Sequence, residues 1–224
     1  MKFVEYPDRE MMMIDLANIL ASELENCLLQ HEHASFAVPG GTTPGPIFDT
    51  LCAVGLDWSR VHVFLTDERW VPETSERSNT RLLKERLLIE NASEARFIPF
   101  YRGGANPEDD LEAAAEELKA ELPVSVMLLG LGADMHTASL FPGADKLEEA
   151  LAGDAPPVMA MRAPGAPEAR ITLTAPVLKG AMSRHIVITG GEKRQAMDRA
   201  VRTGDPMLAP AAAILPGTVV HWAE

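Results

Sequence analysis

The hydrophobic residues of the chain follow two alternating patterns. From Asp8 onward, apolar residues recur every three or four positions, the spacing of a helix with one buried face: Met13, Ala17, Leu20, Leu24 and Leu28. Shorter apolar runs have the length of buried strands: 35–38, 61–65, 124–129, 158–161, 185–189 and 219–222. The alternation predicts an α/β fold whose mainly parallel sheet carries helices on both faces.

Polar residues and prolines indicate where further helices begin and which other segments form strands. Ser78 and Asn106 stand where caps are expected, each just before a helical pattern, and Pro107 suits a first helical turn. The stretch 96–100 predicts a short strand. Residues 170–174 alternate apolar and polar side chains, which predicts a strand with one wetter face.

Four of the expected strands end in chemically distinctive turns. They are Gly40-Gly41-Thr42, Asp67-Glu68-Arg69, Asp134-Met135-His136-Thr137 before a helix-like start, and the turn that leads to Lys193. In an open α/β sheet, the loops at the carboxyl ends of the strands line the ligand crevice. We therefore expect these four groups to meet at one polar rim.

Each group also has a purely structural interpretation. His136 alone could be a buried histidine held by backbone bonds, and Asp67 with Arg69 could be an ion pair that caps a strand. The paired glycines allow close approach of the backbone, and the amides and hydroxyls that follow them at a helix start suit an anion or phosphate. A Gly-Gly-Thr turn by itself is weak support for such a site, so the coincidence of all four groups carries the prediction.

Composition sets the class of protein. The 224 residues are 46% hydrophobic and 24% charged, which fits one α/β domain over residues 1–224, without internal repeat or long linker. The net charge of −13 argues against nucleic acid and anionic membranes as partners. It also repels an anionic substrate at long range, but screening over ~8 Å lets a few local cations decide the sign at a site.

The cysteines and the N-terminus indicate the compartment. Cys27 and Cys52 lie in helical patterns without a metal-binding spacing, so we expect buried thiols in a reducing environment. No apolar run approaches the ~20 residues that span a bilayer, and no apolar leader is visible. These features predict a cytoplasmic protein. His31 and His33 follow the first helix, where we expect a solvated turn favoured by the helix dipole.

At this point a resemblance is specific. The chain resembles the 6-phosphogluconolactonases over nearly its whole length, through motifs in the same order: Pro39-Gly40-Gly41-Thr42-Thr43-Pro44, residues 66–72 with Ser78-Asn79, Gly130 to Gly143 with its His-Thr-Ala-Ser-Leu-Phe-Pro-Gly run, residues 170–174, and Thr189-Gly190-Gly191-Glu192-Lys193. The resemblance implies a Rossmann-like fold of the sugar-phosphate isomerase type. It also implies hydrolysis of 6-phospho-D-glucono-1,5-lactone to 6-phosphogluconate in the oxidative pentose phosphate pathway, with no metal and no other cofactor.

The motifs suggest a role for each polar residue at the rim. We expect His136 to act as general base toward water, with Asp134 or Asp67 supporting the imidazolium and Arg69 near the developing oxyanion. The substrate phosphate is expected at Gly40, Gly41, Thr42 and Thr43. Cations would neutralise it there: Lys193, with Arg77 or Arg170 as further candidates. Arg170 on a strand edge also has a structural interpretation. The expected assembly is a monomer or small homo-oligomer.

Two residues depart from the family pattern. Pro39 stands where a small Ser or Ala is usual, which removes a hydroxyl and a backbone N–H. Met135 stands where Gly is usual. Because an unbranched Met suits an irregular gap better than a strained left-handed position, we expect Met135 to have a negative φ and to pack away from the substrate. A positive φ at Met135 would count against lactonase activity.

Three alternatives remain open. A glucosamine-6-phosphate deaminase shares the fold, but its family has Asp-Glu-Tyr where this chain has Asp67-Glu68-Arg69, and Phe-Asn-Glu-Pro where this chain has 139–142. A non-catalytic sugar-phosphate sensor usually carries a DNA-binding domain, for which this acidic chain has no spare segment. A generic nucleotide-binding Rossmann protein would show a GxGxxG after its first strand, which is absent.

Overall fold

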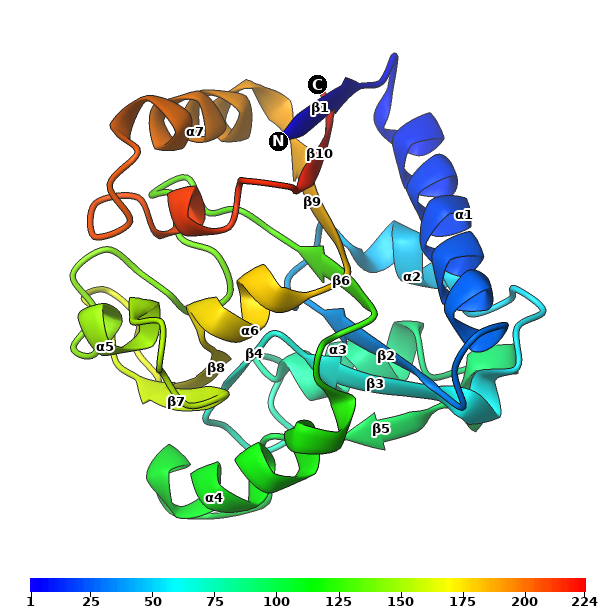
Figure 1. Ribbon diagram of the computed structural model, residues 1–224, viewed down its shortest axis with the longest axis horizontal. Helices are drawn as coiled ribbons and strands as arrows, with labels where there is room; N and C mark the ends of the chain where they lie inside the picture. The colour runs from blue at the N-terminus through cyan, green and yellow to red at the C-terminus, as the bar shows by residue number, and fades with distance from the viewer.

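A seven-stranded sheet runs through the centre of the protein (Figure 1). The computed structural model describes residues 1–224. The order of the strands is β1-β10-β9-β6-β2-β3-β5, and all neighbours are parallel. Their bounds are Lys2–Glu5 (β1), Ala34–Val38 (β2), Val61–Leu65 (β3), Arg96–Ile98 (β5), Val126–Leu129 (β6), Ser183–Thr189 (β9) and Val219–Ala223 (β10). The predicted parallel sheet is confirmed.

Helices cover both faces of this sheet. In Figure 1, α1 and α2 lie on one side of it, and α5, α6 and α7 lie on the other. The helices are Arg9–Leu28 (α1), Gly45–Leu51 (α2), Asn79–Arg86 (α3), Pro107–Leu118 (α4), Leu147–Leu151 (α5), Ala175–Gly180 (α6) and Gly190–Thr203 (α7). The caps follow the sequence: Ser78 accepts from the Arg81 amide at α3, and Asn106 with Asp109 forms a capping box at α4. The predicted helix-like start after His136 is wrong, because residues 137–140 form turns and the next helix is α5.

A second, smaller sheet was not expected from the apolar pattern. Its three antiparallel strands are Asp67–Arg69 (β4), Arg170–Leu173 (β8) and Val158–Met161 (β7), in the order β4-β8-β7. The predicted wetter face of residues 170–174 is wrong: all of β8 is buried, because it is the middle strand of this sheet. The register pairs Asp67 with Thr172 and Arg69 with Arg170, so the small sheet brings charged residues from distant segments together.

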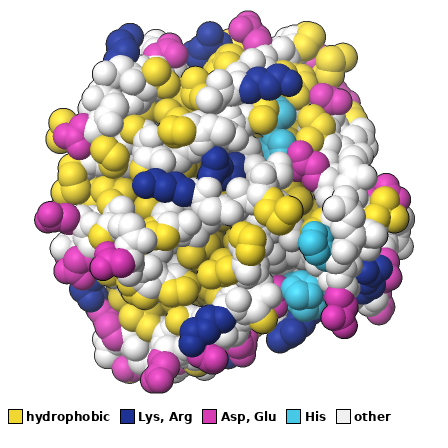
Figure 2. All heavy atoms as spheres, in the orientation of Figure 1, with side chains coloured by type: hydrophobic (Ala, Val, Ile, Leu, Met, Phe, Trp, Pro, Cys, Tyr) yellow, Lys and Arg dark blue, Asp and Glu magenta, His cyan; other side chains and the backbone are white.

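The apolar interior is continuous across both sheets. A single cluster of 58 buried apolar residues includes side chains of both sheets and all seven helices. None of the helices combines the length and the hydropathy that crossing a bilayer would require. On the face shown in Figure 2, acidic and basic side chains are scattered among apolar ones. The excess negative charge therefore does not gather in one block on that face.

Candidate active site

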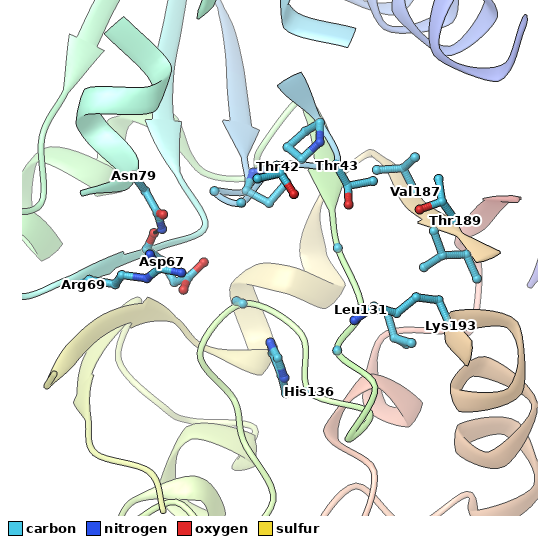
Figure 3. A pocket seen from close by; sticks show the side chains of 18 of the residues that line it. Thr42, Thr43, Asp67, Arg69, Asn79, Leu131, His136, Val187, Thr189 and Lys193 are labelled. Atoms are coloured by element: carbon cyan, nitrogen blue, oxygen red, sulfur yellow. Dashed lines mark hydrogen bonds between the residues drawn. The ribbon is translucent and has the colours of Figure 1, made fainter. Parts of the chain in front are cut away.

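A crevice of about 350 Å³ opens at the carboxyl ends of four neighbouring strands, β9, β6, β2 and β3. This is a volume suited to a small polar ligand. Figure 3 shows side chains from these strand ends around a common space, with Asp67 and Arg69 on one side, Thr42 and Thr43 above, Lys193 opposite and His136 below. The four turns singled out from the sequence are thus brought to one rim.

The two glycines after β2 serve different purposes. A Cβ at Gly40 would lie 2.0 Å from Asn79 Oδ1, so only glycine fits between β2 and the start of α3. Gly41 has a φ of +87°, in the region that glycine adopts without strain. The turn continues through Thr42 and Thr43, and all four residues line the crevice. Pro39 lines it too, so that departure from the family pattern places a ring without an N–H at the rim.

His136 and Asp134 form a tight pair after β6. His136 Nδ1 lies 2.5 Å from Asp134 Oδ1, and the His136 amide donates to the same oxygen at 3.2 Å. Burial by itself would raise the pKa of Asp134, but the hydrogen bond and the charge of His136 outweigh burial and lower it. A Cβ at Gly132 would lie 2.0 Å from His136 Nδ1. The glycine is therefore required by the close approach of this imidazole.

Met135 contradicts one prediction. Its φ is +69°, not negative. The reason is the shape of the loop: the Met135 amide donates to the Gly132 carbonyl at 2.9 Å, and the Gly132 amide donates to the His136 carbonyl at 2.8 Å. A left-handed residue lets the chain reverse within this short span. The Met135 side chain packs against the core and is not part of the crevice lining, as expected.

Asp67 belongs to a different network from His136. Its Oδ2 accepts from Ser139 Oγ at 2.6 Å and lies 3.7 Å from Arg170 Nη1. Of the two carboxylates considered for His136, Asp134 is the one that contacts it. Arg69 and Arg170 both line the crevice. The Nε atom of each is buried and has no hydrogen-bond partner. Burial lowers the pKa of Arg170, although the charge of Asp67 opposes the shift.

Of the three cationic residues expected to bind the phosphate, two lie at the crevice and one does not. Lys193, in the first turn of α7, and Arg170, on β8, line the crevice. Arg77 does not: its guanidinium pairs with Glu168, and its carbonyl accepts from Arg69 Nη1 at 3.0 Å. Arg77 therefore supports Arg69 through its backbone and stays outside the crevice.

Sequence reasoning missed three residues that shape the site. Asn79 lines the crevice and donates to the Asp67 carbonyl at 2.9 Å. Phe141 lies between two predicted residues, with its ring centroid 4.2 Å from that of His136 and 5.3 Å from the Arg170 guanidinium carbon. Glu68 is fully buried and accepts from the Asn79 and Thr80 amides, and its burial raises its pKa. All three lie in the motifs quoted above, but no residue type or spacing indicates these contacts.

The lining of the crevice is cationic although the protein is acidic. It contains Arg69, Arg170 and Lys193, and its one carboxylate is Asp67, which is already paired with Arg170. This excess of positive charge favours an anionic ligand. Fold and site define a Rossmann-like α/β protein with a cationic crevice lined by His136, whose carboxylate partner Asp134 lies just outside the lining.

Comparison with known proteins specifies the family. Residues 7–222 match the family described as glucosamine-6-phosphate isomerases/6-phosphogluconolactonase, and the chain belongs to it. The 6-phosphogluconolactonase of Rhizobium meliloti (strain 1021) is 40% identical over 93% of this chain and 92% of its own. The crystal structure of a 6-phosphogluconolactonase from Shewanella baltica OS155 covers 100% of this chain and 97% of its own, with a TM-score of 0.96 and 32% identity.

The fold extends to the deaminase branch of the family. A monomeric glucosamine-6-phosphate deaminase of known structure has a TM-score of 0.85 to this chain at 14% identity. This likeness confirms the predicted fold of the sugar-phosphate isomerase type. At that identity it concerns the fold alone, and the identities of 32% and 40% are to proteins named as lactonases.

Proposed function

We propose that this chain hydrolyses 6-phospho-D-glucono-1,5-lactone to 6-phosphogluconate, with His136 as general base and without a covalent intermediate. The observation that carries the proposal is the His136–Asp134 pair, whose imidazole lines a crevice of cationic character. The named lactonases at 32–40% identity support the substrate. The positive φ of Met135 was expected to count against lactonase activity. That expectation tied φ to a blocked site, whereas the Met135 side chain is absent from the crevice lining, so the proposal is kept.

The pair determines which imidazole nitrogen can act. Because Asp134 accepts at Nδ1, that nitrogen holds the proton and Nε2 is left as the basic atom. Nε2 removes a proton from water as the water oxygen bonds to the lactone carbonyl carbon. When the tetrahedral intermediate collapses, the bond between that carbon and the ring oxygen breaks. The imidazolium then returns the proton to the ring oxygen.

Charged groups have two tasks in this scheme. The phosphate is held by Lys193, in the first turn of a 14-residue helix, by the backbone of the turn 40–43 and by the Thr42 and Thr43 hydroxyls. Arg69 stabilises the oxyanion, and Arg170 pairs with Asp67 and adds positive charge.

The surroundings of Ser139 favour water over a serine nucleophile. Its side chain is fully buried, donates to Asp67 and is not part of the crevice lining. A covalent acyl enzyme on Ser139 would need the loop to open. Mass spectrometry of enzyme quenched during turnover should therefore show only the unmodified protein mass, and an adduct would contradict the mechanism but not the activity.

The activity itself is tested by hydrolysis of freshly made 6-phosphogluconolactone, coupled to 6-phosphogluconate dehydrogenase. The spontaneous rate must be subtracted, because δ-lactones open slowly in water. We expect turnover well above that rate with the phosphorylated lactone and much less with gluconolactone. If the purified chain leaves the spontaneous rate unchanged, the proposed function is wrong.

A further inference from the structure

A second cluster of ionisable side chains lies at the opposite edge of the large sheet. His33 precedes β2, His62 is the second residue of β3, and Glu121 ends the short 3-10 helix Lys119–Glu121 between α4 and β6. One ligand atom of each lies within 4.8 Å of the others. His62 Nδ1 is 2.9 and 3.0 Å from the two Glu121 oxygens, and His33 Nε2 is 3.3 Å from Oε2.

The prediction of a solvated turn at His31 and His33 holds for His31 and is wrong for His33. His31 is exposed, as expected for a solvated turn. His33 is not simply solvated: its ring stacks on that of His62 with centroids 4.3 Å apart, and both rings turn a nitrogen toward Glu121. Histidines from two separate segments thus converge on one carboxylate.

The carboxylate lacks a permanent counter-charge. Glu121 is 3% exposed, and its ion-pair partners are His33 and His62 alone. No lysine or arginine forms an ion pair with Glu121. Because a buried charge is costly unless it is paired, the site favours an additional cation.

We propose that His33, His62 and Glu121 bind one divalent transition-metal ion of the zinc class, such as Zn²⁺, Co²⁺ or Ni²⁺. Two imidazoles and a carboxylate are ligands of this class. With metal–ligand bonds of ~2.0–2.2 Å, the ligand atoms around a tetrahedral ion lie ~3.3 Å apart. The observed separations between the histidine nitrogens and the Glu121 oxygens are 2.9–3.3 Å, close to this value, and the two histidine nitrogens lie within 4.8 Å of each other.

One ring must also move. A metal ion lies in the plane of each imidazole that binds it, whereas these rings are stacked at 14° to each other. His33 is the ring that can tilt, because its side chain is 34% exposed on the turn after α1, while that of His62 is 15% exposed. The exposed side of His33 leaves the fourth position to water.

A metal ion at this cluster would act on the stability of the fold, because the cluster lies far from the crevice. The strands β2 and β3 have five residues each, so at ~3.3 Å per residue the cluster lies ~16 Å from the crevice. A bound ion would tie together the turn after α1, the start of β3 and the short 3-10 helix before β6. It would stabilise the fold without touching the reacting atoms.

The test uses metal-free protein without a histidine tag. Isothermal titration with ZnCl₂ should give one site that the exposed control His31→Ala retains and His33→Ala weakens at least ~10-fold. Co²⁺ should give the visible absorption of a four-coordinate ion in the wild type and in His31→Ala, but not in His33→Ala. At an ion concentration ~100 times the Kd, Tm should rise by ~5–10 °C.

A second variant separates this cluster from the crevice. His136→Ala should keep the Zn²⁺ site, because His136 belongs to the other edge of the sheet. The proposal is overturned if wild-type protein binds no Zn²⁺. It is equally overturned if His33→Ala binds as tightly as wild type, or if only His136→Ala loses the ion. None of these outcomes depends on lactonase activity.

Discussion

His136 is the residue on which the proposed chemistry depends most. His136→Ala should lower kcat by ~10²–10⁴-fold, the usual contribution of a positioned acid/base, and change substrate binding little. Asp134→Asn should also lower kcat, since an amide cannot stabilise the imidazolium. The coupled lactone assay measures both, with the exposed His31→Ala as matched control. Near-normal turnover of His136→Ala would make His136 structural.

Met135 offers a second test at this scale. Met135→Gly and Met135→Ala remove the same packing contacts, but only glycine relieves a φ of +69°. Because a non-glycine residue in this region costs ~1–2 kcal/mol, the Gly variant should unfold at higher urea than the Ala variant, by ~1 kcal/mol in free energy. Equal stability of the two variants would mean that the loop adjusts its φ at no cost. The activity of both should stay close to that of wild type.

The helix α7 carries a prediction at the scale of elements. Lys193 in its first turn would contact the phosphate in both ground and transition states, so Lys193→Ala should raise KM by ~10–100-fold and change kcat little. The loss should shrink on gluconolactone, which has no phosphate. Lys179→Ala, at the end of α6 and outside the crevice, is the control. Equal losses on both substrates would place Lys193 elsewhere.

Elements buried on both sides were predictable, and elements defined by distant pairing were not. The strands β2, β3, β6 and β9 are apolar runs bounded by turns, and the order of their turn residues indicated the rim correctly. In contrast, β4 contains Asp67, Glu68 and Arg69, which no hydrophobic pattern marks as a strand. It exists because β8 pairs with it from a hundred residues away.

The same limit applies to the site. Residue types and turn positions indicated His136, Asp134, Arg69, Gly41 and Lys193 as members of one rim. Asp134 and Asp67 could not be told apart as partners of His136, because both follow strands that end at that rim. The difference lies in three-dimensional contacts: Asp67 accepts from Ser139, while Asp134 sits within the loop of His136.

At the scale of the whole molecule, a chain of polar groups with the buried His185 and His221 at its centre links distant parts of the sequence. Glu23 Oε2 is 2.9 Å from His185 Nε2, His185 Nδ1 is 3.0 Å from His221 Nε2, and His221 Nδ1 is 2.9 Å from the Tyr6 hydroxyl. Burial lowers the pKa of His221 to about 4, with a smaller contribution from the charge of His185. His221 is therefore neutral in the folded protein at pH 5, where it is largely protonated in the unfolded chain.

This difference predicts acid-sensitive stability. The unfolded chain binds more protons at His221 than the folded protein between pH ~6.5 and about 4, so the free energy of unfolding should fall as the pH decreases through that window. The full contribution is ~3 kcal/mol. About 2 kcal/mol of this is lost between pH 7 and pH 5, and urea unfolding at these two pH values measures that part. His221→Gln should flatten the dependence even if it lowers stability at pH 7, and an unchanged slope would assign the effect to other groups.

The pairing of β1 with β10 has a consequence for synthesis of the protein. In the sheet, β1 pairs only with β10, so residues 2–5 cannot join the sheet until residues 219–222 have been made. Contacts this distant in sequence form late, because loop closure precedes them. Until then, the outer edge of β9 stays open and the polar chain through His221 is incomplete. Nascent chains that stall before residue 219 would expose a parallel strand edge, the kind of surface that chaperones shield.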